Sequence, residues 1–211
     1  MTRSTRNTPR QIRAQRTIEE ILDGAARLLD RDGYRGLSTN RIAAEAHLSI
    51  GTVYRYFTDK DAIVLALRGR AEEDIMRRLV AALAEALTME VTGGARHVLA
   101  VLVEALEDHR GVMGAVINDL PMGSQSNVLP HIEEHLHHLA RLTLLQHYPQ
   151  LGSADADEII YLGMGTVLQL ALRIAIDRPP AMSKESLLDR AAALLVGANQ
   201  ILAAQTAAEG G

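Results

Sequence analysis

Apolar residues recur at helical spacing along most of this 211-residue chain. The first stripe has i, i+3, i+4 and i+7 spacing and consists of Ile18, Ile21, Leu22, Ala25, Leu28 and Leu29. Thr8 is a typical helix-capping residue, and Pro9 suits the first helical position. Gly33 supplies the left-handed residue that commonly ends a helix. The pattern therefore predicts a long first helix that stops at Gly33.

Two short helices and a second long helix are predicted next. Ser38 is the expected cap of a helix over 39–46, and the turn His47-Leu48-Ser49 leads into a second short helix over 50–56. Thr58-Asp59-Lys60-Asp61 has the form of a capping box that opens a helix reaching about residue 87. Glycine and proline breaks then separate helices near 94–109, 111–120, 128–147, 155–177 and 184–206. Alternating β-branched runs are few, so the predicted fold is all-α.

Charge is distributed unevenly between the two parts of the chain. Residues 1–60 hold 11 Lys and Arg against 7 Asp and Glu, a surplus of +4, while residues 61–211 hold 11 against 19, a deficit of −8. A basic N-terminal segment on an acidic remainder indicates that the segment is the part that meets a polyanion. The absence of cysteine excludes disulfides, thiolate chemistry and Cys-based metal sites.

No segment reads as a signal peptide or a membrane span. The arginines near the N-terminus are not followed by an apolar run. The longest charge-free stretch, 191–208, is rich in Ala and carries Asn and Gln, which favours a buried helix of a soluble protein. We therefore expect a cytoplasmic protein with no membrane segment.

The two short helices inside the basic segment read as a helix-turn-helix. The apolar positions that hold them together are Ile42, Ala43, Ala46, Leu48 and Val53. The second helix then keeps a free face, which is formed by Gly51, Thr52, Tyr54, Arg55 and Tyr56. Gly51 lets another backbone approach closely, and the hydroxyls and the guanidinium can reach phosphates and base edges. Lys60 adds a positive charge at the start of the next helix, where backbone N–H groups already favour a phosphate.

Residues 21–67 resemble the DNA-binding domain of the tetracycline-repressor (TetR/AcrR) family. The matching features are the first helix ending at Gly33-Tyr34, Ser38-Thr39 before Ile42-Ala43, the run from Ser49 through Gly51-Thr52-Val53-Tyr54 to Tyr56-Phe57, and Lys60. The sequence departs from the family at His47, where the family usually has Gly. Histidine tolerates left-handed dihedral angles better than bulky residues do, so this departure is compatible with the turn.

The resemblance implies a three-helix helix-turn-helix domain over 1–60 and a helical ligand-binding and dimerisation domain over 61–211. In such a domain Thr39 contacts a phosphate, the free face of the second short helix lies in or against the major groove, and Lys60 lies on the DNA backbone. Arg41 and the N-terminal arginines are further candidates, and Phe57 is expected in the core. The candidate DNA-binding residues are thus Thr39, Arg41, Gly51, Thr52, Tyr54, Arg55, Tyr56 and Lys60.

The resemblance also implies a small-molecule effector bound among the middle helices. Candidate ligand-binding residues are His109, Met113, Ile117, Asn118, Leu136, Met164 and Leu168. Five Tyr, one Phe and no Trp give little support for stacking a flat aromatic ligand, so a lipophilic effector is favoured. His131, His135 and His138 share one helix face at a spacing that could bind zinc or copper. Because this face borders charged residues, a solvated or pocket-rim face is favoured, and no metal or cofactor is expected.

The last two helices carry small residues among Leu and Ile, which permits close helix packing. The stripes are Leu187, Ala191, Leu194, Ala198 and Ile201 on helix 184–206, and Ile160, Gly163, Val167, Ala171 and Ile174 on helix 155–177. Periodicity alone fits an intramolecular core nearly as well as a subunit interface. The family resemblance favours a homodimer through these two helices.

The expected function is that of a homodimeric repressor that binds a palindromic operator in double-stranded DNA and is released by an effector. An activator of the same fold remains open, because the sign of regulation depends on where the operator lies. An all-α enzyme with an appended helix-turn-helix is a further alternative. Against it, the sequence has no phosphate-binding glycine loop and no nucleophile-elbow motif, so we expect no enzyme.

Overall fold

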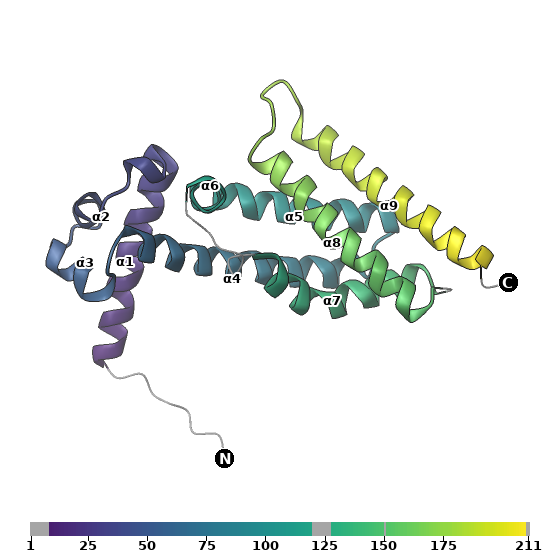
Figure 1. The fold of residues 1–211 in the computed structure, drawn as a ribbon, viewed down its shortest axis with the longest axis horizontal. Helices are drawn as coiled ribbons and strands as arrows, with labels where there is room; N and C mark the ends of the chain where they lie inside the picture. Colours follow the sequence, from purple (N-terminus) through teal and green to yellow (C-terminus); the bar gives the residue numbers. More distant parts are fainter. Residues whose placement is uncertain (1–8, 120–127, 150, 210–211) are drawn as a thin grey trace, which may run out of the picture. The chain divides into compact units, whose positions relative to one another are not determined.

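The fold comes from a computed structural model and is described for residues 9–119, 128–149 and 151–209, without the side chains of 9–10, 128–135, 199 and 202–209. These residues form nine α-helices and one 3-10 turn, with no strand among them (Figure 1). The all-α prediction is confirmed. The elements are α1 (Pro9–Asp32), η1 (Tyr34–Gly36), α2 (Thr39–Glu45), α3 (Ile50–Tyr56), α4 (Lys60–Ala86), α5 (Val91–Asp108), α6 (Arg110–Asn118), α7 (Val128–His147), α8 (Ser153–Ala175) and α9 (Lys184–Glu209).

The helix ends follow local capping chemistry. Gly33 has φ +67° and ends α1 as predicted, while the predicted cap Thr8 lies outside the described residues. Asp59 caps α4, since its Oδ1 accepts a hydrogen bond from the Ala62 N–H at 2.8 Å. Several boundaries differ from the prediction by one to three residues, and the largest shift at a helix start is that of α5. α5 begins before its glycine pair because the Glu90 carboxylate accepts hydrogen bonds from the first free N–H groups of the helix.

The chain divides into two compact units. The head unit comprises residues 1–71 and 111–122, and the body unit comprises residues 72–110 and 123–211. α4 is shared, because its first part belongs to the head unit and its remainder to the body unit. The functional boundary between residues 60 and 61 remains a prediction.

The head unit is built on the apolar face of α1. Five residues of the predicted stripe are buried, namely Ile21, Leu22, Ala25, Leu28 and Leu29. α2 packs against this helix, and α3 packs against α2. Gly111 brings the start of α6 against the end of α1, and its N–H donates to Asp30 Oδ1 at 3.0 Å. A Cβ at Gly111 would lie 2.8 Å from the Asp30 backbone nitrogen, so only glycine permits this approach.

The body unit packs α5 against α8 and α9, with α7 against α8 (Figure 1). Its core includes Leu99, Val103 and Leu188, which are at most 2% exposed. Arg96 of α5 donates to Asp189 of α9 at 2.6 Å and fixes these two helices side by side. Among the described residues, α8 is the one helix long and apolar enough to cross a membrane by length and composition. In the body unit it lies against α5, α7 and α9.

Candidate nucleic-acid interface and cavity

α3 is attached to the head unit through few contacts. Val53 is its only fully buried residue, and it packs with the bracing helix α2, which buries Ile42 and Ala43. Of the remaining residues, Gly51, Tyr54 and Arg55 are exposed. Thr52 and Tyr56 are half-buried. The free face that the sequence predicts on this helix is therefore open to solvent in the head unit.

The turn before α3 uses a left-handed histidine. His47 stands where the family usually has Gly, and it has φ +56°. It therefore adopts the left-handed dihedral angles that were expected at this position. The Leu48 N–H donates to the Ala43 carbonyl at 2.9 Å and closes the end of α2. Ser49 then caps α3, because its Oγ accepts from the Thr52 N–H at 3.1 Å and lies 2.8 Å from the Thr52 Oγ1. These bonds fix where the free face begins.

Two predicted DNA-binding residues from different helices meet at their hydroxyls. The Oγ1 of Thr39, at the start of α2, lies 3.1 Å from the OH of Tyr54 on α3. When two hydroxyls share one hydrogen, the accepting hydroxyl keeps its own O–H for another partner. The pair can therefore donate a hydrogen bond outward while each side chain holds the other in place.

Arg55 carries a positive charge that no described carboxylate neutralises. Its guanidinium carbon lies 5.1 Å from the centre of the Tyr56 ring, and its Nη2 donates to the Tyr56 OH at 3.4 Å. The tyrosine ring orients the guanidinium without cancelling its charge. Arg55 is thus available to an anionic partner.

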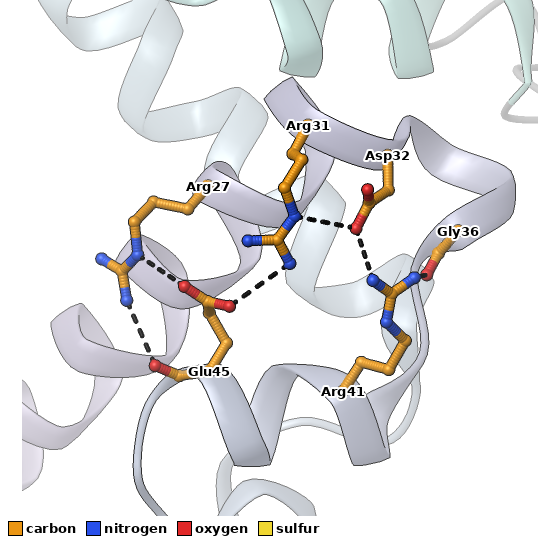
Figure 2. A network of polar contacts seen from close by, with 6 residues as sticks. All are labelled: Arg27, Arg31, Asp32, Gly36, Arg41 and Glu45. Carbon is orange, nitrogen blue, oxygen red and sulfur yellow. Dashed lines mark hydrogen bonds and ion pairs between the residues drawn. The ribbon is translucent and has the colours of Figure 1, made fainter.

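Arg41 is held by the head unit itself. Its guanidinium donates to Asp32 and to the carbonyl of Gly36 (Figure 2). The pKa of Asp32 is raised by desolvation, but the hydrogen bonds from Arg41 and Arg31 outweigh this effect and leave it below its ordinary value. The predicted DNA contact of Arg41 remains a prediction, whereas its contacts in the structure tie α2 to the end of α1.

Glu45 extends this network, and sequence reasoning missed it. Arg27 donates to Glu45 Oε1 at 3.0 Å, and Arg31 donates to Glu45 Oε2 at 3.5 Å (Figure 2). The hydrogen bond from Arg27 lowers the pKa of Glu45. The signal in the sequence is the i, i+4 spacing of the two arginines, which places both on one side of α1. Three arginines of the basic segment are therefore paired with carboxylates.

Lys60 lies over an aromatic ring at the start of α4. Its Nζ lies 4.0 Å from the centre of the Tyr34 ring and donates to the Tyr34 carbonyl at 3.4 Å. The Tyr34 hydroxyl in turn donates to Asp61 Oδ1 at 2.5 Å. This hydrogen bond, together with burial, raises the pKa of Tyr34 to about 12. The contacts join η1 to α4 and fix the position of the lysine.

The body unit contains a cavity of about 240 Å³ that is lined by α4, α5, α7, α8 and α9. Its wall is mainly Leu, Val, Ala and Ile, and its hydroxyl and imidazole groups come from Thr143, His147 and Tyr148. No Asp, Glu, Lys or Arg lines it within the described part of the chain. The predicted ligand-binding residues Leu136, Met164 and Leu168 lie in this wall.

The other four predicted ligand-binding residues do not line the cavity. α5 ends at Asp108, so His109 lies beyond the helix and its Nε2 is 3.1 Å from Asp74 Oδ2. Met113, Ile117 and Asn118 lie on the part of α6 that belongs to the head unit. They are not part of the wall of this cavity, and their role in ligand binding stays a prediction. Sequence reasoning missed His147 and Tyr148, although His147 follows Thr143 by one helical turn.

The predicted histidine face is only partly described. The side chains of His131 and His135 lie outside the described residues, and His138 is exposed. Among the side chains that are described, no group of three or more His, Asp or Glu could hold a metal ion.

α8 and α9 each bury one face in the body unit and leave a second apolar face exposed. Ile160, Ala171, Ile174 and Ala191 were predicted in a subunit interface, but they are buried inside the unit. The exposed large side chains are Tyr161, Leu162, Leu194 and Ile201, which are 61–72% exposed. Leu194 and Ile201 belong to the predicted stripe of α9 and are exposed, so the correction of helix face applies to α8 and to Ala191.

A helix-turn-helix with one solvent-facing helix, carried on an all-helical chain, defines the class of helical DNA-binding regulators. Residues 21–67 match the family model described as bacterial regulatory proteins, tetR family. An HTH-type transcriptional regulator of Mycobacterium tuberculosis is 29% identical over 178 residues, which cover 81% of this chain and 71% of that relative. The regulator YvkB of Bacillus subtilis is 43% identical over 51 residues. The matched segment is only 24% of this chain and 27% of the length of YvkB.

Solved structures agree with this assignment at the level of the fold. A TetR-family regulator from Streptomyces coelicolor has a TM-score of 0.67 at 18% identity, covering 92% of this chain and 89% of its own. A regulator from Saccharomonospora viridis in complex with choline has a TM-score of 0.62 at 22% identity, covering 84% of this chain and 94% of its own. Over residues 21–67 the chain thus matches the TetR family of transcriptional regulators, and it shares the fold of solved members of that family.

Proposed function

We propose that the protein is a homodimeric repressor that binds a palindromic operator through α3 and is released by a small lipophilic effector. The observation that carries this proposal is the free face of α3, which is attached through one buried residue, Val53. A helix attached so sparingly leaves its other side chains for a partner. In this function the protein acts in the cytoplasm, where bacterial DNA is found.

The side chains on and beside α3 suit a DNA duplex. Arg55 has the geometry for bidentate contact with a guanine edge or a phosphate. The Thr39–Tyr54 hydroxyl pair suits a phosphate oxygen, and Lys60 adds a backbone contact. A Cβ at Gly51 would meet only the Ser49 Oγ, at an ordinary 3.9 Å. The chain itself has no need of glycine there, which supports a close approach by the DNA backbone.

The exposed apolar faces of α8 and α9 support pairing with a second copy. Tyr161 and Leu162 on α8 and Leu194 and Ile201 on α9 are exposed, and the two helices pack against each other. Exposed large apolar side chains that gather on one face commonly mark an interface. A two-fold dimer presents two copies of α3, so it requires an operator with two inverted half-sites.

The cavity supports a role for an effector. The neighbour from Saccharomonospora viridis holds choline, and the cavity here is apolar enough for a lipophilic molecule. α4 belongs to both units and provides a continuous helix through which the state of the body unit can reach the head unit. A hundredfold loss of operator affinity requires about 2.7 kcal/mol of coupling, and the operator must weaken effector binding by the same factor.

Selection of bound duplexes from a random DNA pool tests the DNA-binding proposal. The full-length protein should enrich an inverted repeat, and binding of that repeat should weaken steeply as salt rises. Enrichment of no sequence above the starting pool would contradict the proposal. A promoter carrying the selected repeat then separates repressor from activator, since transcription falls in the first case and rises in the second. Recovery of the effector unchanged after incubation distinguishes a sensor from an enzyme.

A further inference from the structure

Tyr148 contributes a hydroxyl-bearing side chain to the cavity wall. Tyr148 follows the last residue of α7 and is 9% exposed, packed in a cluster with Leu151 and Ile159. Within the described part of the chain its OH has no hydrogen-bond partner. Burial raises the pKa of Tyr148, so the phenol is neutral and has a hydrogen to donate. A phenol with no described partner at the cavity wall keeps its hydrogen for an occupant that accepts a hydrogen bond.

Thr143 offers a hydrogen-bond acceptor to the cavity, so it requires an occupant that donates a hydrogen bond. Its Oγ1 donates to the Leu139 carbonyl at 3.0 Å, so its remaining capacity is that of an acceptor. It lines the cavity together with His147, which lies one turn further along α7. A neutral imidazole offers one donor and one acceptor. The polar part of the wall is therefore complementary to a group that both accepts and donates hydrogen bonds.

Charged head groups do not meet these requirements. A carboxylate offers only acceptors, and the last carbonyls of α7 disfavour an anion at this end of the helix. An ammonium group offers only donors. A quaternary ammonium such as choline needs an aromatic cage or a carboxylate, and Tyr148 is the one aromatic side chain in the described wall. Burying an unpaired charge is costly, so the occupant is neutral.

The rest of the wall is suited to an aliphatic chain. Apolar side chains line it along α7 from Leu136, about 16 Å before His147. Met164 on the facing helix α8 can adapt its shape, and Gly163 leaves open space. The volume of about 240 Å³ corresponds to roughly eight groups of the size of a water molecule.

We propose that the effector is a neutral medium-chain aliphatic alcohol, whose hydroxyl accepts from Tyr148 and donates to Thr143 while its chain fills the apolar part of the cavity. The regulatory role of this ligand rests on the proposed function, but its binding to the cavity can be tested without DNA. 1-Octanol is the probe. Octanoate, octylammonium and 1-methoxyheptane serve as comparison ligands. Each has the same number of non-hydrogen atoms as 1-octanol or one more, and differs from it in the head group.

Titration calorimetry with the full-length protein should rank 1-octanol above octanoate and octylammonium by at least tenfold in affinity. Tyr148→Phe should weaken 1-octanol about fivefold, the usual effect of one hydrogen bond. Urea denaturation of Tyr148→Phe, followed by circular dichroism, checks that this variant folds as the original protein does. Thr143→Val should weaken 1-octanol but leave 1-methoxyheptane unchanged, since the ether has no hydrogen to donate.

A second variant guards against a folding defect in Tyr148→Phe. Gly163→Leu should fill the cavity and abolish binding of 1-octanol, because a Cβ at Gly163 meets nothing within 4 Å. Gly114→Leu is its control, with equally open space and no part in the cavity wall. Tighter binding of octanoate or octylammonium, or equal binding of 1-octanol by Gly163→Leu, would overturn the inference. Binding of 1-octanol that leaves operator affinity unchanged would support the cavity chemistry and contradict the proposed release mechanism.

Discussion

Replacing Tyr34 with Phe tests how the start of α4 is held in the head unit. The change removes the hydroxyl that donates to Asp61 Oδ1 at 2.5 Å, and it keeps the ring beneath Lys60. A rise in the pKa of Tyr34 from 10.0 to about 12 corresponds to roughly 2.7 kcal/mol in favour of the neutral phenol. Both side chains are only partly buried, so solvent screening reduces this figure. We expect Tyr34→Phe to lower the free energy of unfolding by about 1–2 kcal/mol.

The pH dependence has a definite sign. Because the pKa of Tyr34 is raised in the folded state, its contribution is complete below pH 10, the ordinary value for tyrosine. It is then lost as the pH rises through the folded value of about 12. The difference in stability between the original protein and Tyr34→Phe should therefore be constant at neutral pH and should shrink in strong alkali.

Two measurements check this prediction. Urea denaturation followed by circular dichroism gives the stability difference, with the original protein as the reference. The chain has five Tyr and no Trp, so subtracting the phenolate absorbance of the variant isolates the titration of Tyr34. A stability equal to that of the original protein, with Tyr34 ionising at its ordinary pH, would refute the reasoning.

Three further predictions concern the DNA-reading residues and the dimer. Arg55→Ala should reduce the free energy of binding to the selected operator by about 1–3 kcal/mol, compared with its effect on a site with one changed base pair. Fluorescence anisotropy measures both affinities. Lys60→Ala should weaken all sequences alike and reduce the salt slope by about one unit per half-site, and an altered base preference would argue against a backbone role. Leu194→Glu should give monomers in light scattering, because it places an unpaired charge in the proposed interface, whereas Leu142→Glu on α7 should not. A dimer that persists in Leu194→Glu would place the interface elsewhere.

The parts of the fold that were predictable depend on signals close in sequence. Ser38 caps α2 as expected, because a capping side chain bonds N–H groups only two or three residues away, and Ser49 of the predicted turn caps α3 in the same way. The buried stripe of α1 and the docking of Val53 also follow from local periodicity. The helix-turn-helix was therefore accessible from the sequence alone.

The faces of α8 show where local signals end. Ile160 is buried and its neighbour Tyr161 is 72% exposed, although both are large and mainly apolar. A helix that is apolar on two sides satisfies the same periodicity in either orientation. Which side faces α5 and α9 is decided by packing between residues far apart in the sequence.

Net charge counted from the sequence does not show which basic residues are available to DNA. The surplus of +4 over residues 1–60 counts every arginine equally. In the head unit Arg27, Arg31 and Arg41 are engaged with Glu45 and Asp32, so they hold α2 on α1. Arg55 has no such partner among the described carboxylates, and it lies on the exposed helix. The pairing thus converts part of a basic composition into a rigid support, while Arg55 keeps an available charge on the exposed face of α3.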